Sequence, residues 1–169
     1  MNQMLPTTTT IFQDTEQDLV QQGFQFERKD FNRPWGGFFV IDESQAAAFV
    51  AKYFPGFDTA DLIDGRKVSP KILLVAPNKR LSWQYHFRRS EVWRVVSGTV
   101  GIVRSDTDEE GVLKSYKVGD TVTLAKGERH RLVGLEEWGM VAEIWQHTEP
   151  ENPSDEDDIV RLQDDFGRK

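Results

Sequence analysis

Residues 81–98 read LSWQYHFRRSEVWRVVSG and place polar side chains at regular intervals among large apolar residues. Gln84 and His86 are two residues apart, and side chains at that spacing project from the same face of a strand. Glu91 follows a bend predicted at residues 88–90 and opens the next apolar segment. We therefore expect an amide, an imidazole and a carboxylate to converge on the inner face of a β-sheet.

A second segment, residues 119–134 with sequence GDTVTLAKGERHRLVG, supplies another imidazole at His130. Gly119 and Gly127 bracket a predicted strand and turn before this histidine. The chain contains no cysteine, so any metal must be bound through nitrogen and oxygen. The predicted ligands of one divalent metal ion per chain are Gln84, His86, Glu91 and His130. Such ligands suit Zn²⁺, Mn²⁺, Co²⁺, Ni²⁺ or Fe²⁺, and Zn²⁺ is slightly favoured.

The length of 169 residues and an apolar content of 38% predict one folded domain. After Lys71, short segments rich in Val, Ile, Leu and Trp alternate with Gly, Asp, Asn and Pro clusters, and no helix follows each strand. This pattern disfavours a doubly wound α/β fold and predicts an all-β sandwich, jelly roll or small barrel. The predicted strands are KILLVAP, EVWRVVSG, TVGIVRS, LKSYKV, DTVTLA, RHRLVGL and GMVAEIWQ.

The N-terminal third has a different texture. The alanine-rich residues 44–54 predict a helix that ends before Pro55. A weaker pattern predicts a short helix that starts at Asp14 or Thr15 and closes at Gly23. The first ten residues, with four consecutive threonines, are expected to lack regular structure. We divide the chain into an N-terminal arm, 1–30, partly disordered or helical, and a single domain, 31–169, that includes a C-terminal surface segment.

The charge of the chain disfavours nucleic acid as a partner. There are 28 acidic and 21 basic residues, for a net charge of −7, which repels a phosphate backbone. The sequence has no run of about 20 apolar residues and no secretory signal pattern at its start. We expect a cytoplasmic protein with no membrane partner.

The two segments resemble the paired motifs of the cupins, and more narrowly those of the C-terminal cupin domain of type II mannose-6-phosphate isomerases, also called phosphomannose isomerases. Most cupins have HxH in the first motif, whereas these isomerases have LSxQxH, as in residues 81–86. ExWxVVxG at 91–98, GxxHR at 127–131, RPWG at 33–36 and EDDIVRxxDxFGR at 156–168 also match. The resemblance implies a double-stranded β-helix, the jelly-roll barrel of cupins, with one or two short N-terminal helices, and a homodimer.

The same resemblance implies a metal-dependent aldose-ketose isomerase that interconverts mannose 6-phosphate and fructose 6-phosphate. Such a reaction needs a cation for the developing oxyanion, a base, and a cationic group for the phosphate. Arg131 is the first choice for stabilising the intermediate or binding phosphate, because its guanidinium stays charged. Lys71 matches the family's lysine at the start of the strand that leads to the first motif, where it could contact substrate. Glu143, which alternates with Val141 and Trp145, is a possible base.

Two further residues are expected to bind the substrate. Ser82 shares the parity of Gln84 and His86 and should face the pocket. Arg88 forms a basic pair with the next residue on the loop after His86, where a phosphate could dock. The five tryptophans are expected in the core, and His147 lies outside both segments and receives no role.

Three positions depart from the family pattern, and they keep two alternatives open. Ala125 replaces a proline, Gly134 an asparagine, and Phe87 begins a stretch that is histidine-rich in the family. The glycine-rich nucleotide loop of the bifunctional members is absent, so guanylyltransferase activity is not expected. The site could isomerise another sugar or sugar phosphate, or the protein could be a cupin that binds a sugar or metabolite without turning it over.

Overall fold

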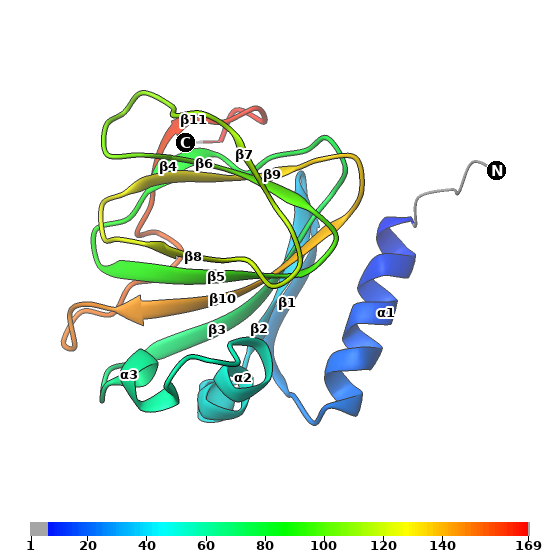
Figure 1. Ribbon diagram of the computed structural model, residues 1–169, viewed down its shortest axis with the longest axis vertical. Helices are drawn as coiled ribbons and strands as arrows, with labels where there is room; N and C mark the ends of the chain where they lie inside the picture. The colour runs from blue at the N-terminus through cyan, green and yellow to red at the C-terminus, as the bar shows by residue number, and fades with distance from the viewer. Residues whose placement is uncertain (1–6, 169) are drawn as a thin grey trace.

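The computed structural model describes residues 7–168, which form two antiparallel sheets with helices at the N-terminal end. The sheets face each other and enclose the interior of a barrel (Figure 1). The six-stranded sheet contains, in spatial order, β1 (Phe26–Arg33), β2 (Gly36–Ile41), β3 (Val68–Val75), β10 (Gly139–His147), β5 (Arg89–Ser97) and β8 (Thr121–Leu124). The five-stranded sheet contains β11 (Val160–Gln163), β4 (Trp83–Tyr85), β9 (Arg129–Gly134), β6 (Val100–Ser105) and β7 (Lys114–Tyr116). The prediction of an all-β barrel or sandwich is confirmed.

Strands β2, β3 and β10 of the six-stranded sheet are buried on both faces, which explains their continuous apolar runs, whereas the edge strands β1 and β8 have exposed residues. In β3, Ile72 and Leu74 point outward into the apolar cluster beneath the helices, whereas Leu73 and Val75 point into the barrel. The same two-residue alternation runs through β5 and β10, which pair antiparallel with each other. Every second residue of these strands therefore faces the barrel interior.

The helices cover the outer face of this sheet (Figure 1). They are α1 (Thr8–Gln21), the short 3-10 turn η1 (Glu43–Gln45), α2 (Ala46–Tyr53) and α3 (Thr59–Ile63). The helix predicted over residues 44–54 is confirmed as α2, and the Asp42 side chain caps the preceding turn η1 by accepting from the backbone N–H of Ser44. Helix α3 was not predicted; the Asp58 carboxylate accepts from two backbone N–H groups at its start.

The N-terminal prediction is wrong at one end of α1. The helix begins at Thr8, with Thr7 as its N-cap, rather than at Asp14 or Thr15. Threonines are weak helix formers. However, Phe12 and Leu19 bury their side chains in the apolar cluster between the helices and the six-stranded sheet, which we call the outer apolar cluster. This packing extends the helix back through the threonine run. The rest of the stretch expected to lack structure, residues 1–6, lies outside the described residues.

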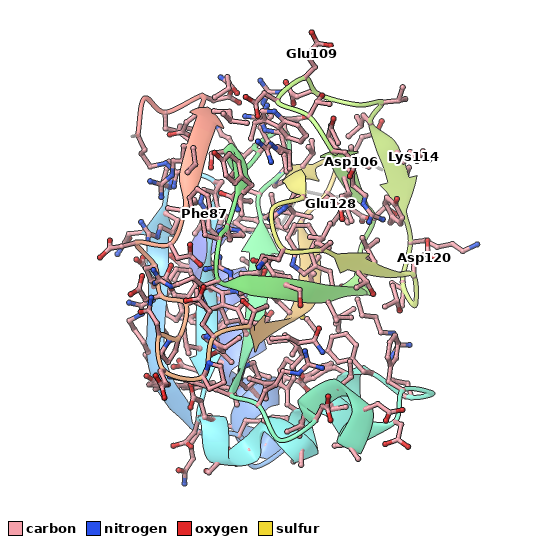
Figure 2. All side chains as sticks on the ribbon, turned by 90° about the vertical axis from the view of Figure 1, so that its left-hand side faces the viewer. Phe87, Asp106, Glu109, Lys114, Asp120 and Glu128 are labelled. Atoms are coloured by element: carbon pink, nitrogen blue, oxygen red, sulfur yellow. The ribbon has the colours of Figure 1, made fainter. Side chains whose placement is uncertain are left out.

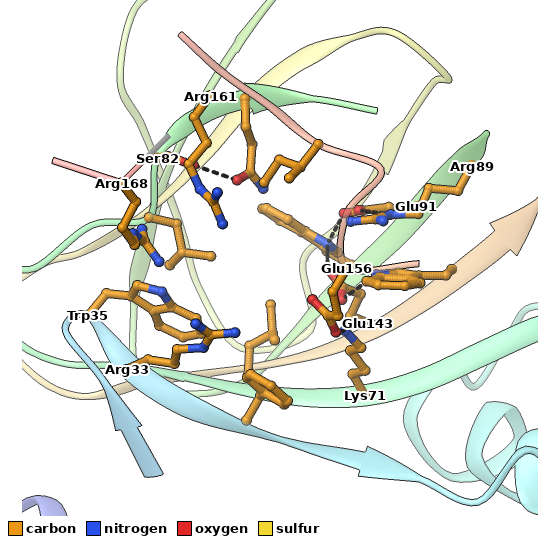
Figure 3. Close-up of a pocket in the computed structure, with 17 residues that line it drawn as sticks. Arg33, Trp35, Lys71, Ser82, Arg89, Glu91, Glu143, Glu156, Arg161 and Arg168 are labelled. Carbon is orange, nitrogen blue, oxygen red and sulfur yellow. Dashed lines mark hydrogen bonds and ion pairs between the residues drawn. The ribbon is translucent and has the colours of Figure 1, made fainter. Parts of the chain in front are cut away.

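The β1–β2 turn brings the RPWG motif to one end of the barrel. Gly36 has a φ of +144°, and a Cβ there would lie 2.0 Å from the carbonyl oxygen of Leu74. Only glycine fits that approach. The turn sets Arg33 and Trp35 at the rim of the interior cavity (Figure 3).

The C-terminal segment, residues 154–168, returns to the barrel through long-range contacts. Strand β11 pairs antiparallel with β4, and Asp165 accepts two hydrogen bonds from Arg80 at 2.6 and 2.8 Å. The Asp158 carboxylate accepts from the backbone N–H groups of Phe87 and Arg88. These contacts place part of the segment over the cavity.

Among residues 7–168, no helix has both the length and the apolar character needed to cross a membrane.

The outer apolar cluster should contribute strongly to stability. Phe39 is fully buried and contacts the rings of Phe12, Phe26 and Phe31. We expect Phe39→Ala to lower the free energy of unfolding by about 3–5 kcal/mol, because it leaves a cavity. The matched control is Phe57→Ala, at a ring that is 39% exposed, with an expected loss of about 1 kcal/mol or less. Equal losses in urea unfolding of the two variants would contradict this account of the core.

Candidate metal centre

A cavity lies inside the barrel between the two sheets, and strands of both sheets line it (Figure 3). Because of the two-residue alternation, β5 contributes Arg89, Glu91 and Trp93 from one face. Two further residues of that sheet, Lys71 on β3 and Glu143 on β10, are cross-strand partners in register. One wall of the cavity is therefore set by the strand pattern of the six-stranded sheet.

His86, Glu91 and His130 form a compact buried group, and Glu91 of this group lines the cavity. Their potential ligand atoms all lie within 4.8 Å of one another. Nε2 of His86 is 3.2 Å from Oε1 of Glu91, and Nε2 of His130 is 3.7 Å from Oε2. The three side chains are at most 2% exposed. The structure thus brings together three of the four predicted metal ligands.

The hydrogen bonds of the two imidazoles orient them for metal binding. Nδ1 of His86 lies 2.7 Å from the carbonyl oxygen of Asp158, and Nδ1 of His130 lies 3.0 Å from that of Glu128. A carbonyl only accepts, so in the neutral ring each Nδ1 carries the proton and each Nε2 has a free lone pair. Nε2 of His86 lies 3.2 Å from Oε1 of Glu91 and also 3.2 Å from Nη2 of Arg89, which donates to it. Nε2 of His130 is buried without a hydrogen-bond partner. This set fits a divalent cation, which would satisfy that nitrogen and bind the carboxylate.

The electrostatics of the group keep its ligands in the binding form. The Arg89 guanidinium donates to Oε1 of Glu91 at 2.8 Å, and this positive charge holds the Glu91 pKa well below its usual value despite burial. Burial lowers the pKa of His130 to about 4. A carboxylate that stays ionised and an imidazole that stays neutral are the forms that bind a metal.

Gln84 lies beside this group. It is the register partner of His130 on the neighbouring strand, so both side chains project from the same face of the sheet. Its Oε1 accepts a hydrogen bond of 2.6 Å from Ser82. Both Ser82 and Gln84 line the cavity. The amide oxygen is thus bound to the serine hydroxyl, and its assignment as a metal ligand stays a prediction.

Lys71 and Glu143 form the floor of the cavity. Glu143 accepts from the indole N–H groups of Trp93 at 2.7 Å and Trp145 at 2.8 Å. Burial, assisted by the nearby Glu91 charge, raises the pKa of Glu143 to about 8. Burial likewise lowers the pKa of Lys71, whose Nζ lies 2.8 Å from Oε1 of Glu156. The lowered pKa of Lys71 and the raised pKa of Glu143 both favour the neutral form of the side chain. Such shifts are common for residues that act in acid–base catalysis.

The structure places two of the predicted substrate residues outside the cavity. Arg131 donates to the carbonyl oxygen of Leu81 and pairs with Glu110 on the other face of β9. The two-residue period of a strand already predicts that Arg131 points away from the face that carries His130, because adjacent residues project to opposite faces. Arg88 donates to the carbonyl oxygen of Pro153 and pairs with Asp155 at 3.3 Å. Direct contact of either guanidinium with a substrate in the cavity is therefore not supported.

Sequence reasoning gave no site role to five charged residues of the cavity. Arg89 has the same parity as Glu91, so the two-residue period could have identified it. Arg33, Glu156, Arg161 and Arg168 belong to the N- and C-terminal motifs, but no local signal shows that these motifs meet at the cavity.

His147 has a structural explanation. Its Nδ1 accepts from the backbone N–H of Ser154 at 2.9 Å, so its Nε2 carries the proton and donates to Ser69 at 2.8 Å. A histidine that donates to a serine does not activate it as a nucleophile.

The three positions that depart from the family pattern do not line the cavity. Phe87 lies at the surface, 58% exposed (Figure 2). At Gly134, a Cβ would lie 2.0 Å from the carbonyl oxygen of Ala76, so the larger family residue would collide with the backbone of the neighbouring turn.

Comparison with known families gives a match over most of this region. A family model described as the mannose-6-phosphate isomerase C-terminal domain matches residues 50–164. The chain belongs to this family. The matched residues include the whole His86, Glu91 and His130 group, so the candidate metal centre lies in the part that defines mannose-6-phosphate isomerase C-terminal domains.

Curated relatives of this mannose-6-phosphate isomerase C-terminal domain are much longer proteins. The xanthan biosynthesis protein XanB of Xanthomonas campestris pv. campestris is 33% identical over 66% of this chain and 22% of its own length. A mannose-1-phosphate guanylyltransferase of Salmonella montevideo is 30% identical over the same shares. The chain thus spans about a fifth of the length of the relatives it matches.

Solved structures agree on the fold. Oxalate decarboxylase of Bacillus subtilis superposes with a TM-score of 0.56 at 12% identity, over 80% of this chain and 30% of that one. At this identity the similarity shows the barrel alone. The predicted double-stranded β-helix of the cupins is confirmed.

The buried histidine predicts a pH dependence of stability in metal-free protein. The ordinary imidazole pKa of 6.5 applies in the unfolded chain, whereas in the fold burial lowers that of His130 to about 4. As pH falls through this window the unfolded state takes up a proton and the folded state does not, so stability falls. Between pH 6.5 and 4.5, chelator-treated wild type should lose about 2–3 kcal/mol more than His130→Gln. Urea unfolding at both pH values measures this, and equal losses would show that burial does not shift His130.

Proposed function

We propose that the protein is a metal-dependent isomerase that interconverts mannose 6-phosphate and fructose 6-phosphate. Family membership supports this assignment, and the observation that carries it is the buried group of His86, Glu91 and His130, whose carboxylate lines a cavity. The same cavity contains a lysine and a second carboxyl with shifted pKa values. A metal-binding group and an acid–base pair are the parts that this reaction requires.

The reaction moves a proton between C1 and C2 of the sugar through an enediolate. A bound divalent cation supplies Lewis acidity that stabilises the oxygen on which negative charge develops. His86, Glu91 and His130 would bind this ion. The ionised Glu91 partly balances its charge, and Arg89 holds that carboxylate in place.

Glu143 is the residue that we propose as the base. Its carboxyl lies at the cavity floor, and the two indole N–H groups fix its orientation. A raised pKa makes it a stronger base than an exposed glutamate. It can take the carbon-bound proton in the ionised form and return it to the neighbouring carbon, as transfer between two adjacent carbons requires.

Lys71 lies beside this carboxyl and can donate to a sugar oxygen. Its ammonium sits 3.6 Å from the ring centre of Trp145 and pairs with Glu156. The surrounding walls include the indole rings of Trp35 and Trp93, which exclude water from the reacting carbons.

The pocket favours the family substrate over the two alternatives. The positions that depart from the family lie outside the cavity wall, so they give no reason for a different sugar or for a binding protein without turnover. Homodimer formation and the cytoplasmic location stay predictions.

The first test joins metal analysis to a coupled assay. Metal-loaded protein should contain about one ion per chain and convert mannose 6-phosphate to fructose 6-phosphate, and a chelator should abolish turnover. The double variant Glu91→Gln, His130→Ala should lose both the ion and the activity, because it removes two of the proposed ligands. The matched control for the carboxylate is Glu137→Gln, at an exposed glutamate. Turnover by the double variant at the wild-type rate would contradict the proposal.

The second test addresses the base. Glu143→Gln should lower kcat by about 10²–10⁴ while the metal content stays unchanged. In wild type, activity should fall as pH falls, with an apparent pKa above the ordinary glutamate value of 4.5, because burial favours the neutral carboxyl. That acid limb should be absent from the residual activity of the variant. A pH–rate profile that keeps the limb after the substitution would assign the base elsewhere.

A further inference from the structure

The C-terminal segment contacts the bend that separates two of the metal-binding residues. His86 lies just before this bend, at residues 87–88, and Glu91 lies just after it on strand β5. The carbonyl oxygen of Asp158 lies 2.7 Å from Nδ1 of His86. The Asp158 carboxylate accepts from the backbone N–H groups of Phe87 at 2.9 Å and Arg88 at 3.0 Å. We propose that Asp158 is a positioning residue that orients His86 for metal binding; this inference rests on the metal centre of the proposed function.

The two imidazoles are oriented by different kinds of contact. The carbonyl oxygen that faces Nδ1 of His130 belongs to Glu128, two residues earlier in the chain. The carbonyl oxygen that faces Nδ1 of His86 belongs to Asp158, 72 residues later. In metal sites, the partner of the second ring nitrogen fixes the tautomer and the direction of the imidazole. The orientation of His86 therefore depends on where the C-terminal segment lies, whereas that of His130 is fixed within its own segment.

A local turn prepares Asp158 for this contact. Oδ1 of Asp155 accepts from the backbone N–H groups of Asp157 at 2.9 Å and Asp158 at 3.1 Å, as in an Asx turn. Asp158 is only 4% exposed, and a buried carboxylate must be hydrogen-bonded. The bend at residues 87–88 supplies two of its donors. The carboxylate and the bend thus each satisfy polar groups of the other.

Ser154 connects Asp158 to the arginine of the metal centre. Its hydroxyl donates to Oδ2 of Asp158 at 2.5 Å and accepts from Nη1 of Arg89 at 3.0 Å. Arg89 in turn donates to Oε1 of Glu91. The backbone N–H of Ser154 donates to Nδ1 of His147, which holds the start of the segment in place. One connected set of hydrogen bonds thus reaches a metal-binding residue on each side of the bend.

Asparagine at position 158 cannot replace the carboxylate. The two carboxylate oxygens accept from three donors, of which two are the backbone N–H groups of the bend. An amide has one accepting oxygen, and its NH₂ group only donates. In either orientation of the amide, one backbone N–H of the bend would therefore face another donor. The bend must then move away from the segment, and the carbonyl oxygen of residue 158 would no longer fix the His86 ring.

One test follows the Nδ1 protons by NMR of chelator-treated protein with ¹⁵N-labelled histidine. The chain has three histidines, so each signal can be assigned. In Asp158→Asn the Nδ1 proton of His86 should exchange with water about two- to tenfold faster than in wild type, since one hydrogen bond is lost. The Nδ1 proton of His130 should keep its rate. The matched control is Asp157→Asn, at the exposed neighbour, which should change neither rate. An unchanged rate at His86 in Asp158→Asn would overturn the proposal.

The second test measures the affinity for Co²⁺ by visible absorption in competition with a chelator. Asp158→Asn should weaken binding about ten- to a hundredfold, which is typical for a residue that orients a metal ligand. The absorption band should change as well, because one ligand is less well placed. Asp157→Asn should match wild type. A Co²⁺ affinity and spectrum equal to wild type in Asp158→Asn would show a merely structural role, even if that variant unfolds at a lower urea concentration.

Ser154→Ala is a milder change in the same network. It removes one hydroxyl and leaves the two N–H groups of the bend on the Asp158 carboxylate. Co²⁺ binding should weaken about two- to tenfold, the contribution of one hydrogen bond. This variant decides the question if Asp158→Asn does not fold. Wild-type values of both the His86 proton exchange and the Co²⁺ affinity in Ser154→Ala would then overturn the proposal.

These measurements do not depend on turnover, so they separate the positioning role from the assigned reaction. If Co²⁺ affinity falls in the variants and wild type does not convert mannose 6-phosphate, the positioning role holds and the isomerase assignment is wrong. If wild type is active and all variants equal it in Co²⁺ affinity and in His86 proton exchange, the isomerase assignment holds and the positioning role is wrong.

Discussion

The buried carboxylate of Glu91 is the constraint on which the site depends. A charge that is 2% exposed must be balanced within the protein. Arg89 on the same strand, with His86 and His130 from the opposite sheet, surrounds it, and this draws the two sheets together at one point. The barrel, its cavity and its candidate metal centre thus meet around a single anion.

The two ends of the cavity differ in character because different parts of the chain build them. Neighbouring strands in close register provide the carboxyls, the lysine and the indoles. The β1–β2 turn and the C-terminal segment provide the arginines. The first end contains groups whose pKa values are shifted toward neutrality, and the second contains guanidinium groups. The C-terminal segment is therefore part of the site rather than a surface appendage.

The local sequence pattern predicted secondary structure correctly where tertiary packing favoured the same structure. It failed where tertiary packing favoured another one. The alternation of apolar residues located the strands around Glu91 and Glu143, and both faces proved buried. The threonine run has poor helix propensity, yet burial of Phe12 and Leu19 carries α1 through it. The assignment of Arg131 failed for another reason, since its adjacency to His130 in sequence means opposite faces in a strand.

The sequence alone determined which side-chain types are available to bind a metal. Its two-residue strand period also turns Gln84, His86, Glu91 and His130 toward one interior. These properties follow from side-chain type and from the two-residue strand period, which are local. Only the tertiary structure decided the burial that moves the pKa of Glu143 to about 8 and the meeting of Arg33 with Arg168. Both depend on contacts between segments far apart in the chain, and no local spacing encodes which distant surfaces will pack together.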